Sequence, residues 1–508
     1  MKKYINSNNL TRIFHFLAIG MFFILFYYGL SVTGVEHEKR WVEYITLTQD
    51  SVVFNLLKLL LSVIIFFLIG KLYERFFCKW NFNILLGIAC VFSLAFSIYW
   101  LNAAPAAPEA DQKLICQFAA AFNQGDFNGL KAGRYIARYP QQLGLVTFLR
   151  VLYYFFGEMN YRAFQYFSAA TVPLCVFSGC QILRKITENN RKIEFYYLLL
   201  IISCFPMYAY VPFVYGDLPS TAFGLLTTWL FLSCLERFSV PKVIALGLAA
   251  GISVQLRKNT LILLVALGIV IIVKLFDKIR WQLIVSGCSI LIGVLLFQGV
   301  NRIIYYDEWD ESAAAIPALL YVVMGFNDDN NNPGWHNGYE YHVFAMSQDD
   351  PKAALEWGRR DFASYMTKFR TEPDYTLDFF TRKMNTQWNS PMYQCRVMND
   401  VFDGDLDRLA STIFYNGRLG ILLQDFMKIY QLLLYGSLLF LLVSKRKKKI
   451  AIEKYALLIA VFGGFLFSMI WEAKTRYVFP YFLMLIPYYA IGVNALVCRM
   501  EEKLKRKH

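Results

Sequence analysis

Long apolar runs, separated by short polar or basic stretches, recur along the whole chain. A helix needs about twenty residues to cross the hydrocarbon core of a bilayer, where its backbone groups must pair within the segment. About twelve runs suit such crossings, so the chain is predicted to be an all-α polytopic membrane protein. The predicted spans are Ile13–Val35, Val52–Leu72, Phe82–Leu101, Ala163–Leu183, Phe195–Tyr215, Leu218–Leu235, Val243–Val254, Leu261–Leu275, Leu283–Val300, Phe426–Val443, Leu457–Ile470 and Val478–Cys498.

The composition agrees with this class. Hydrophobic residues make up 57% of the 508 residues and charged residues only 17%, whereas soluble proteins carry about 25% charged residues. The net charge of +14 is spread over short clusters between apolar runs. Such clusters set the orientation of membrane helices, so they do not indicate a nucleic-acid partner. The expected surroundings of the chain are membrane lipids.

The basic clusters follow alternate spans. They predict a plasma-membrane protein with both termini in the cytoplasm. This alternation requires that Leu143–Phe156, with only fourteen residues, does not cross and instead lies at the membrane surface. The clusters are Lys71/Arg75/Lys79, Arg184/Lys185/Arg191/Lys192, Arg237/Lys242, Lys274/Lys278/Arg280, Lys445–Lys449, and Arg499 with Lys503–Lys507.

Four segments are predicted. Two N-terminal spans occupy residues 1–81, and a transmembrane module with a first outer loop at 102–162 occupies 82–300. An outer domain at 301–425 precedes the C-terminal helices and basic tail at 426–508. The outer domain contains helical patterns at Pro351–Phe369 and Tyr375–Trp388. Of the ten cysteines, only Cys116 and Cys395 fall in stretches predicted to lie on the outer side, and pairing between them is left open.

Two acidic clusters lie at predicted outer span ends. Asp111, with Glu109 two residues earlier, opens a helical pattern in the first outer loop. A carboxylate there can accept a proton from an attacking hydroxyl, or it can simply cap the helix. Asp217 lies in Tyr-Gly-Asp-Leu-Pro, where a negative charge at a helix start is itself stabilising.

Two cationic clusters lie on the same side. Arg257 and Lys258 interrupt apolar sequence, so they line a cavity or reach the interface. Lys474 and Arg476 follow Glu472 and precede Tyr477, against the inside preference of basic residues. A guanidinium can bind phosphate oxygens as a fork. The alternative is an ion pair of Glu472 with Arg476 at helical spacing.

The order and sidedness of these motifs resemble the polytopic GT-C glycosyltransferases, which include protein O-mannosyltransferases and the bacterial lipid A aminoarabinose transferase. The motifs are Pro-Glu109-Ala-Asp111, Tyr139-Pro140, Tyr-Gly-Asp217-x-Pro, Arg257-x-Asn, and Glu472-x-Lys474-x-Arg476-Tyr477-x-x-Pro. The resemblance runs from about Phe82 to the C-terminus. Two spans precede it, and the family's Asp-x-Asp is here Glu109-x-Asp111.

The resemblance implies an inverting transfer of a sugar from a polyprenyl-phosphate carrier to an acceptor outside the membrane. Asp111 would be the general base, and Arg476, with Lys474, Arg257 or Lys258, would hold the carrier phosphate. Asp217 would line the sugar or acceptor pocket, near Glu109, Tyr139, Glu472 and Tyr477. The acceptor is expected to be a cell-wall or surface glycan, with a protein as the alternative.

Other classes remain open from sequence. A transporter of lipid-linked glycans would use the outer charges as a translocation path, and a polysaccharide polymerase or ligase would share the carrier chemistry. The sequence contains no P-loop, GxGxxG, HExxH or CxxC…CxxC pattern, and its five histidines are dispersed. No cofactor is therefore expected; a divalent metal is not implied, although the resemblance leaves metal dependence open.

Overall fold

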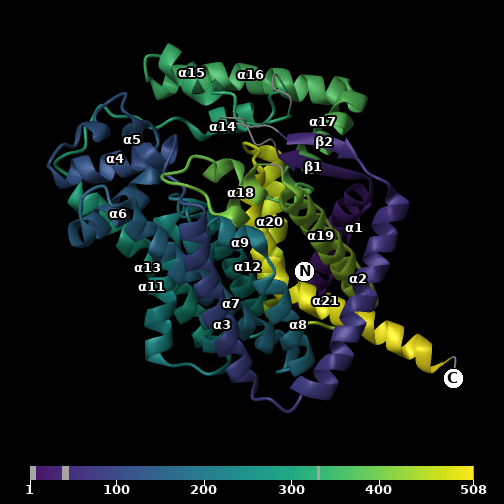
Figure 1. Cartoon of the computed structure of the whole chain (residues 1–508). Helices are drawn as coiled ribbons and strands as arrows, with labels where there is room; N and C mark the ends of the chain where they lie inside the picture. The colour runs from purple at the N-terminus through teal and green to yellow at the C-terminus, as the bar shows by residue number, and fades with distance from the viewer. Residues whose placement is uncertain (1–6, 37–44, 329–331, 416, 507–508) are drawn as a thin grey trace.

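The computed structural model describes residues 7–36, 45–328, 332–415 and 417–506. Long helices form a bundle, and shorter helices gather at one end of it (Figure 1). The bundle contains α1 Ser7–Ser31, α2 Val52–Leu72, α3 Phe82–Ala103, α7 Tyr161–Thr187, α8 Arg191–Ile202, α9 Phe205–Ala209, α10 Asp217–Glu236, α11 Val240–Leu256, α12 Leu261–Asp277, α13 Trp281–Ile304, α19 Arg418–Lys445, α20 Ala456–Ile470 and α21 Phe479–Lys505.

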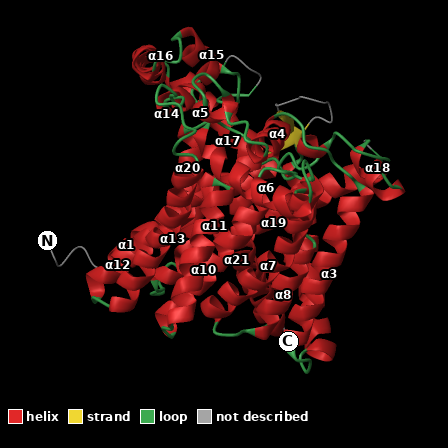
Figure 2. Cartoon of the chain, turned by 90° about the vertical axis from the view of Figure 1, so that its left-hand side faces the viewer, coloured by secondary structure: helices red, strands yellow, loops and turns green. Residues whose placement is uncertain are grey.

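The remaining elements cover one end of the bundle (Figures 1 and 2). Strands β1 Val32–Glu36 and β2 Ile45–Gln49 form an antiparallel hairpin there. The helices are α4 Asp111–Asn123, α5 Tyr135–Arg138, α6 Leu143–Phe156, α14 Ala318–Met324, α15 Tyr339–Met346, α16 Pro351–Thr371, α17 Pro373–Trp388 and α18 Arg408–Phe414. We call residues 318–388 the cap.

The predicted all-α polytopic class is confirmed. Ten helices of the described chain are long and apolar enough to cross a membrane. The 17-residue α11 is a shorter apolar helix at the predicted span Val243–Val254, and the predicted span Phe195–Tyr215 falls on the short helices α8 and α9.

Two predicted span boundaries are wrong. The span Phe195–Tyr215 is broken, because α8 ends at Ile202 and Pro206 lies at the second position of α9. Proline has no N–H to bond the carbonyl of Ile202, four residues earlier, and its ring would clash with that carbonyl, so Pro206 cannot continue α8. The span Ile13–Val35 ends early, because Val32 starts β1.

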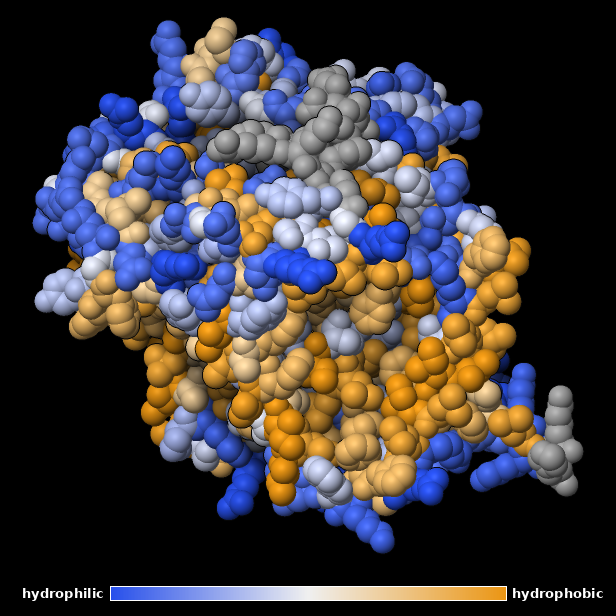
Figure 3. All heavy atoms as spheres, viewed as in Figure 1, coloured by the Kyte–Doolittle hydropathy of each residue, from blue (hydrophilic) through white to orange (hydrophobic). Residues whose placement is uncertain are grey.

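The bundle has two chemically different ends. Figure 3 shows an apolar surface around its middle and hydrophilic residues above and below. At the end away from the cap, Lys185 in the last turn of α7 pairs with Glu236 at the end of α10. Lys274 in α12 pairs with Glu453, just before α20, at 2.6 Å. The predicted basic clusters therefore meet at one end, opposite the cap.

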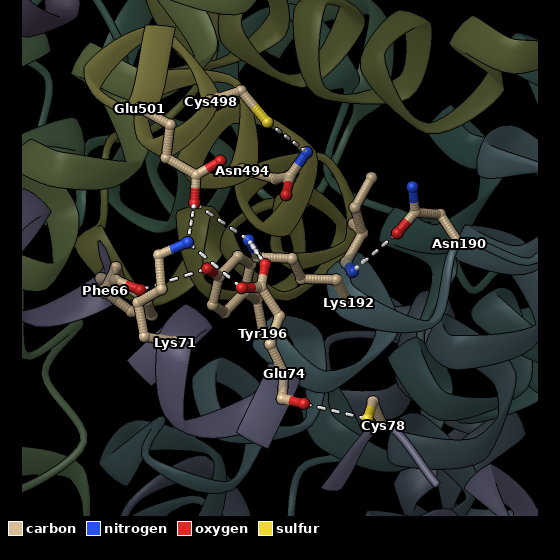
Figure 4. A network of polar contacts seen from close by, with 11 residues as sticks. Phe66, Lys71, Glu74, Cys78, Asn190, Lys192, Tyr196, Asn494, Cys498 and Glu501 are labelled. Atoms are coloured by element: carbon tan, nitrogen blue, oxygen red, sulfur yellow. Dashed lines mark hydrogen bonds and ion pairs between the residues drawn. The ribbon is translucent and has the colours of Figure 1, made fainter. Parts of the chain in front are cut away.

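An ion-pair network at this basic end joins the second helix to the bundle (Figure 4). Lys192 of α8 lies 2.8 Å from Glu74, just after α2, and 3.4 Å from Glu501 of α21. Lys71 of α2 also reaches Glu501, at 3.4 Å. Helix α2 is otherwise mostly exposed, so these contacts help to fix a peripheral helix.

The first helix is different, because it buries one face against the bundle. Ala18, Phe22 and Leu25 of α1 are fully buried, and His15 lies 2.6 Å from the hydroxyl of Tyr455, just before α20. At the other end, Glu36 of β1 pairs with the buried Arg396 at 2.9 Å. The first predicted segment thus contributes to the common core.

Several elements in the stretches predicted to lie outside match their predicted bounds. Helix α6 covers Leu143–Phe156 with the expected bounds, and α16 and α17 cover the two helical patterns of the outer stretch. Tyr154, Phe155 and Phe156 at the end of α6 are exposed, as a surface-bound helix requires. Within the described residues, Cys116 and Cys395 are separate, buried free thiols, so the disulfide left open by the sequence does not form.

The clustering of basic loops predicts which end faces the cytoplasm. After replacing the exposed Cys78, Cys288 and Cys498 by serine, we expect Lys131→Cys, between α4 and α5, to react with a membrane-impermeant maleimide in intact cells. Lys447→Cys, at the basic end, should react only after permeabilisation. The reverse pattern would invert the orientation.

Candidate active site

A cavity of about 780 Å³ lies at the cap end of the bundle. Its walls come from the start of α4, the α5–α6 connection, the start of α10, the α11–α12 turn, the cap and the α20–α21 connection. Eight of the predicted site residues line it: Asp111, Tyr139, Arg257, Lys258, Glu472, Lys474, Arg476 and Tyr477. Segments far apart in the sequence therefore converge on one space.

Asp111 is the first residue of α4, and its side chain does not cap that helix. Ala110 occupies the N-cap position without a side-chain cap. Ala110 also has a positive φ of 48°, which is unfavourable for a residue with a Cβ. The carboxylate of Asp111 instead accepts a hydrogen bond of 3.0 Å from the hydroxyl of Tyr215. Asp111 is exposed, so the carboxylate is within reach of a bound molecule.

Tyr215 connects this acid to two cations. Its hydroxyl accepts a hydrogen bond from the amide of Gln142 at 2.5 Å while donating to Asp111. The guanidinium of Arg257 lies 4.4 Å from the centre of its ring, and that of Arg476 lies 4.9 Å from it. Both distances are within the range of cation–π attraction.

Asp217 lies behind the cavity wall, in contrast to the predicted lining role. It is buried, and its carboxylate is 3.4 Å from Nε of Arg257. Gly216 sets this geometry, because its φ is 84° and a Cβ there would lie 2.4 Å from the carbonyl oxygen of Leu256. Only glycine permits this close approach of the α10 start to the end of α11. Asp217 therefore orients and partly neutralises Arg257.

Arg476 has no directly paired carboxylate among the described residues, and Asp217 acts on it only at longer range. No carboxylate among the described residues lies within 4 Å of its guanidinium, and its Nε has no hydrogen-bond partner there. Its other neighbours are the rings of Phe213 and Tyr477 and the sulfur of Met398, 3.6 Å from Nη1. A buried cation of this kind is costly unless an anion joins it.

The predicted alternative pairing of Glu472 with Arg476 does not form. Helix α20 ends at Ile470, and the following 3₁₀ turn begins at Thr475, so the two residues share no helix. Glu472 lies 3.7 Å from Lys474 instead, and it accepts a hydrogen bond of 3.2 Å from the hydroxyl of Tyr477.

Glu109 lines a second, smaller cavity of about 90 Å³. Asp111, Tyr215, Lys474 and Arg476 line both cavities, so they form the wall between them. Glu109 therefore lies next to the candidate site but does not line its larger cavity.

The cap contributes residues that the sequence did not single out. The segment after Gly334 runs beside Glu472–Lys474, because Trp335 pairs with Ala473 as an isolated bridge and the N–H of Ala473 donates to the carbonyl of Gly334. This contact brings His336 and Glu340 to the cavity, together with Tyr321 and Trp471. No local motif signals these residues, since the cap is far from the other motifs in sequence.

The described residues contain no group of three His, Cys, Asp or Glu side chains that could hold a metal ion.

No family model matches the chain, and no curated protein sequence matches it. Among solved structures, the crystal structure of the Archaeoglobus fulgidus oligosaccharyltransferase in the apo form is similar over 85% of this chain and 52% of that one. The sequence identity is 12% and the TM-score 0.44. The chain spans about half the length of that protein, and a likeness this distant does not define a function.

A buried lysine fixes the cap to the site. Lys383 of α17 is fully buried and donates hydrogen bonds to the carbonyls of Gly325 and Trp471. Burial lowers the pKa of Lys383 from 10.5 to about 7, with Glu472 opposing this shift. Between these values the unfolded chain binds more protons than the folded one, so stability should rise with pH.

We expect the thermal stability of the purified protein to increase from pH 7 to pH 9.5 for this reason. Lys383→Met should reduce that increase, because the group that titrates is removed. Lys352→Met, at an exposed position of α16, serves as the matched control and should keep it. An equal increase in the wild type and Lys383→Met would contradict the assignment.

Proposed function

We propose that this protein is an inverting membrane glycosyltransferase that moves a sugar from a polyprenyl-phosphate carrier to an acceptor hydroxyl. The support is the arrangement around Tyr215: two buried guanidiniums, those of Arg257 and Arg476, contact its ring, and its hydroxyl bonds the exposed Asp111. Only Arg257 is paired, with Asp217. The arrangement places an exposed acid and a guanidinium without a paired carboxylate among the described residues in a single cavity.

The phosphate of the carrier would bind at Arg476. A guanidinium binds phosphate oxygens through two parallel hydrogen bonds, and a partly buried site strengthens them. Lys258 and Lys474 line the same cavity and would add positive charge. These cations would stabilise the negative charge that develops on the phosphate oxygen as it leaves.

Asp111 would act as the general base. The acceptor hydroxyl oxygen attacks the anomeric carbon, and the bond from that carbon to the phosphate oxygen breaks with its electron pair going to the phosphate. The hydroxyl proton passes to Asp111. Attack opposite the leaving group inverts the anomeric configuration, and no covalent intermediate with the protein is required.

The cavity is proposed to face the outside of a bacterial plasma membrane, with both termini in the cytoplasm. The support is the clustering of basic residues at the opposite end of the bundle. We propose a cell-wall or surface glycan as the acceptor, by analogy with the resembling families alone; comparing glycan composition with and without the gene product tests it.

A transporter is the competing class. Transporters place their substrate sites near the middle of the bilayer, at broken helices. Here the charged groups gather at the cap end of the helices: Arg257 lies between α11 and α12, and Arg476 lies between α20 and α21. This position favours chemistry at the membrane surface over passage through the bundle.

We expect Asp111→Asn to lower the rate of sugar transfer by about 10²–10⁴-fold, because an amide cannot accept the proton. Transfer from a prenyl-phosphate-linked sugar in purified membranes measures it, with protein level and carrier-lipid binding as checks. Asp126→Asn, an exposed acid in the same outer loop, should leave the rate unchanged. Full activity in Asp111→Asn would exclude this residue as the base.

We expect Arg476→Ala to raise the apparent KM for the lipid-linked sugar by about tenfold to a hundredfold, since a hydrogen bond to a charged group contributes about 1.5–3 kcal/mol. Initial rates at varied donor concentration measure the change. Arg134→Ala, at an exposed arginine of the first outer loop, is the matched control. A KM equal to that of the wild type would remove Arg476 from the phosphate site.

A further inference from the structure

A histidine and a buried glutamate from the cap form a second ionisable pair at the main cavity. Nε2 of His336 lies 3.4 Å from the carboxylate of Glu340, and the two side chains are 42% and 2% exposed. Both residues line the cavity. The imidazole is accessible, whereas the carboxylate lies behind it.

The buried carboxylate is incompletely satisfied. Oε2 of Glu340 is shielded from solvent and has no hydrogen-bond partner within the part of the chain that the structure describes. Glu340 lies in the first turn of α15, where the helix stabilises negative charge. A buried carboxylate is stabilised by a cation close by, and a protonated His336, 3.4 Å away, can supply one.

The surroundings of His336 favour its charged form. Glu340 raises the pKa of His336 above its ordinary value of 6.5, and Glu472 acts in the same direction, whereas burial and Lys474 lower it. Glu340 comes from α15, and Glu472 and Lys474 come from the segment between α20 and α21. Charged groups from two separate elements therefore act on the imidazole.

The backbone holds this histidine firmly beside the site. The adjacent Trp335 is buried, donates its indole N–H to Thr386 at 3.1 Å, and pairs with Ala473. His336 is therefore fixed next to Glu472 and Lys474, at the wall of the space that Arg476 also lines.

We infer that His336, held by Glu340, is a proton-controlled anion-binding group of this cavity. When protonated, it would take an anionic group of a substrate, either the phosphate of the lipid carrier or the carboxylate of an acidic sugar. Glu340 acts as a positioning residue. The inference rests on the proposed function for the identity of the substrates, but the pair itself is independent of Asp111 and Arg476.

The test measures binding to the detergent-solubilised full-length protein by isothermal titration calorimetry between pH 5.5 and 8.5. The probes are farnesyl phosphate and methyl glucuronide, with methyl glucoside as the neutral control. Above the pKa of His336, wild-type affinity for the relevant anion should fall by about tenfold for each pH unit. The phosphate itself loses a proton near pH 6, which acts in the opposite direction.

Four variants test whether the pH dependence of binding comes from His336 and Glu340. His336→Asn should bind the anion more weakly at low pH and without the fall, and His336→Lys should bind it across the whole range. Glu340→Gln should move the fall to lower pH. His342 is an exposed histidine of α15, the helix that contains Glu340. His342→Asn should behave as the wild type, which would exclude a general effect of substitutions in the cap.

The probe that shows this dependence identifies the source of the anion. The inference is overturned if wild type binds neither anion at pH 5.5, or if His336→Asn keeps the wild-type pH dependence for both. Farnesyl phosphate binding that is lost in Arg476→Ala but does not depend on His336 would refute the inference and leave the phosphate site standing. Binding of methyl glucuronide alone, dependent on His336, would support the inference and count against the proposed carrier.

Discussion

The site depends on the side chain of Tyr215, which contacts the acid and both arginines at once. Its hydroxyl bonds Asp111, and its ring is close to Arg257 and Arg476. Two like charges at one ring repel each other, and their placement is tolerated because aromatic rings and the nearby Asp217 offset part of the cost. The remaining positive charge is what makes the cavity suitable for an anion.

This arrangement requires a scaffold that fixes three separate helix ends together. The α10 start approaches the α11 end closely because residue 216 is glycine. The α20–α21 connection is held by the bridge between Trp335 and Ala473 and by the hydrogen bond from Lys383 to Trp471. Because these contacts are buried and hydrogen-bonded, the charged side chains have little freedom to move apart.

The sidedness of the molecule follows from the same constraint. Charged groups are tolerated at helix ends and are costly in the apolar middle. The bundle places paired basic residues, such as Lys192 with Glu74 and Glu501, at one end and the cavity at the other. One face of the first helix packs against this bundle, so α1 is part of the scaffold that carries the cavity.

The sequence by itself determined the helical class, most of the spans and the side on which the charged motifs gather, because apolar length and charge placement are local properties. It located α6 and eight of the residues that line the cavity. It could not show that Asp217 pairs with Arg257 behind the cavity wall, or that the helix is interrupted between Ile202 and Phe205. The tertiary structure alone decided the roles of Tyr215, His336, Glu340 and Lys383. Their partners lie far away in sequence, and each of these interactions exists only when separate helix ends meet.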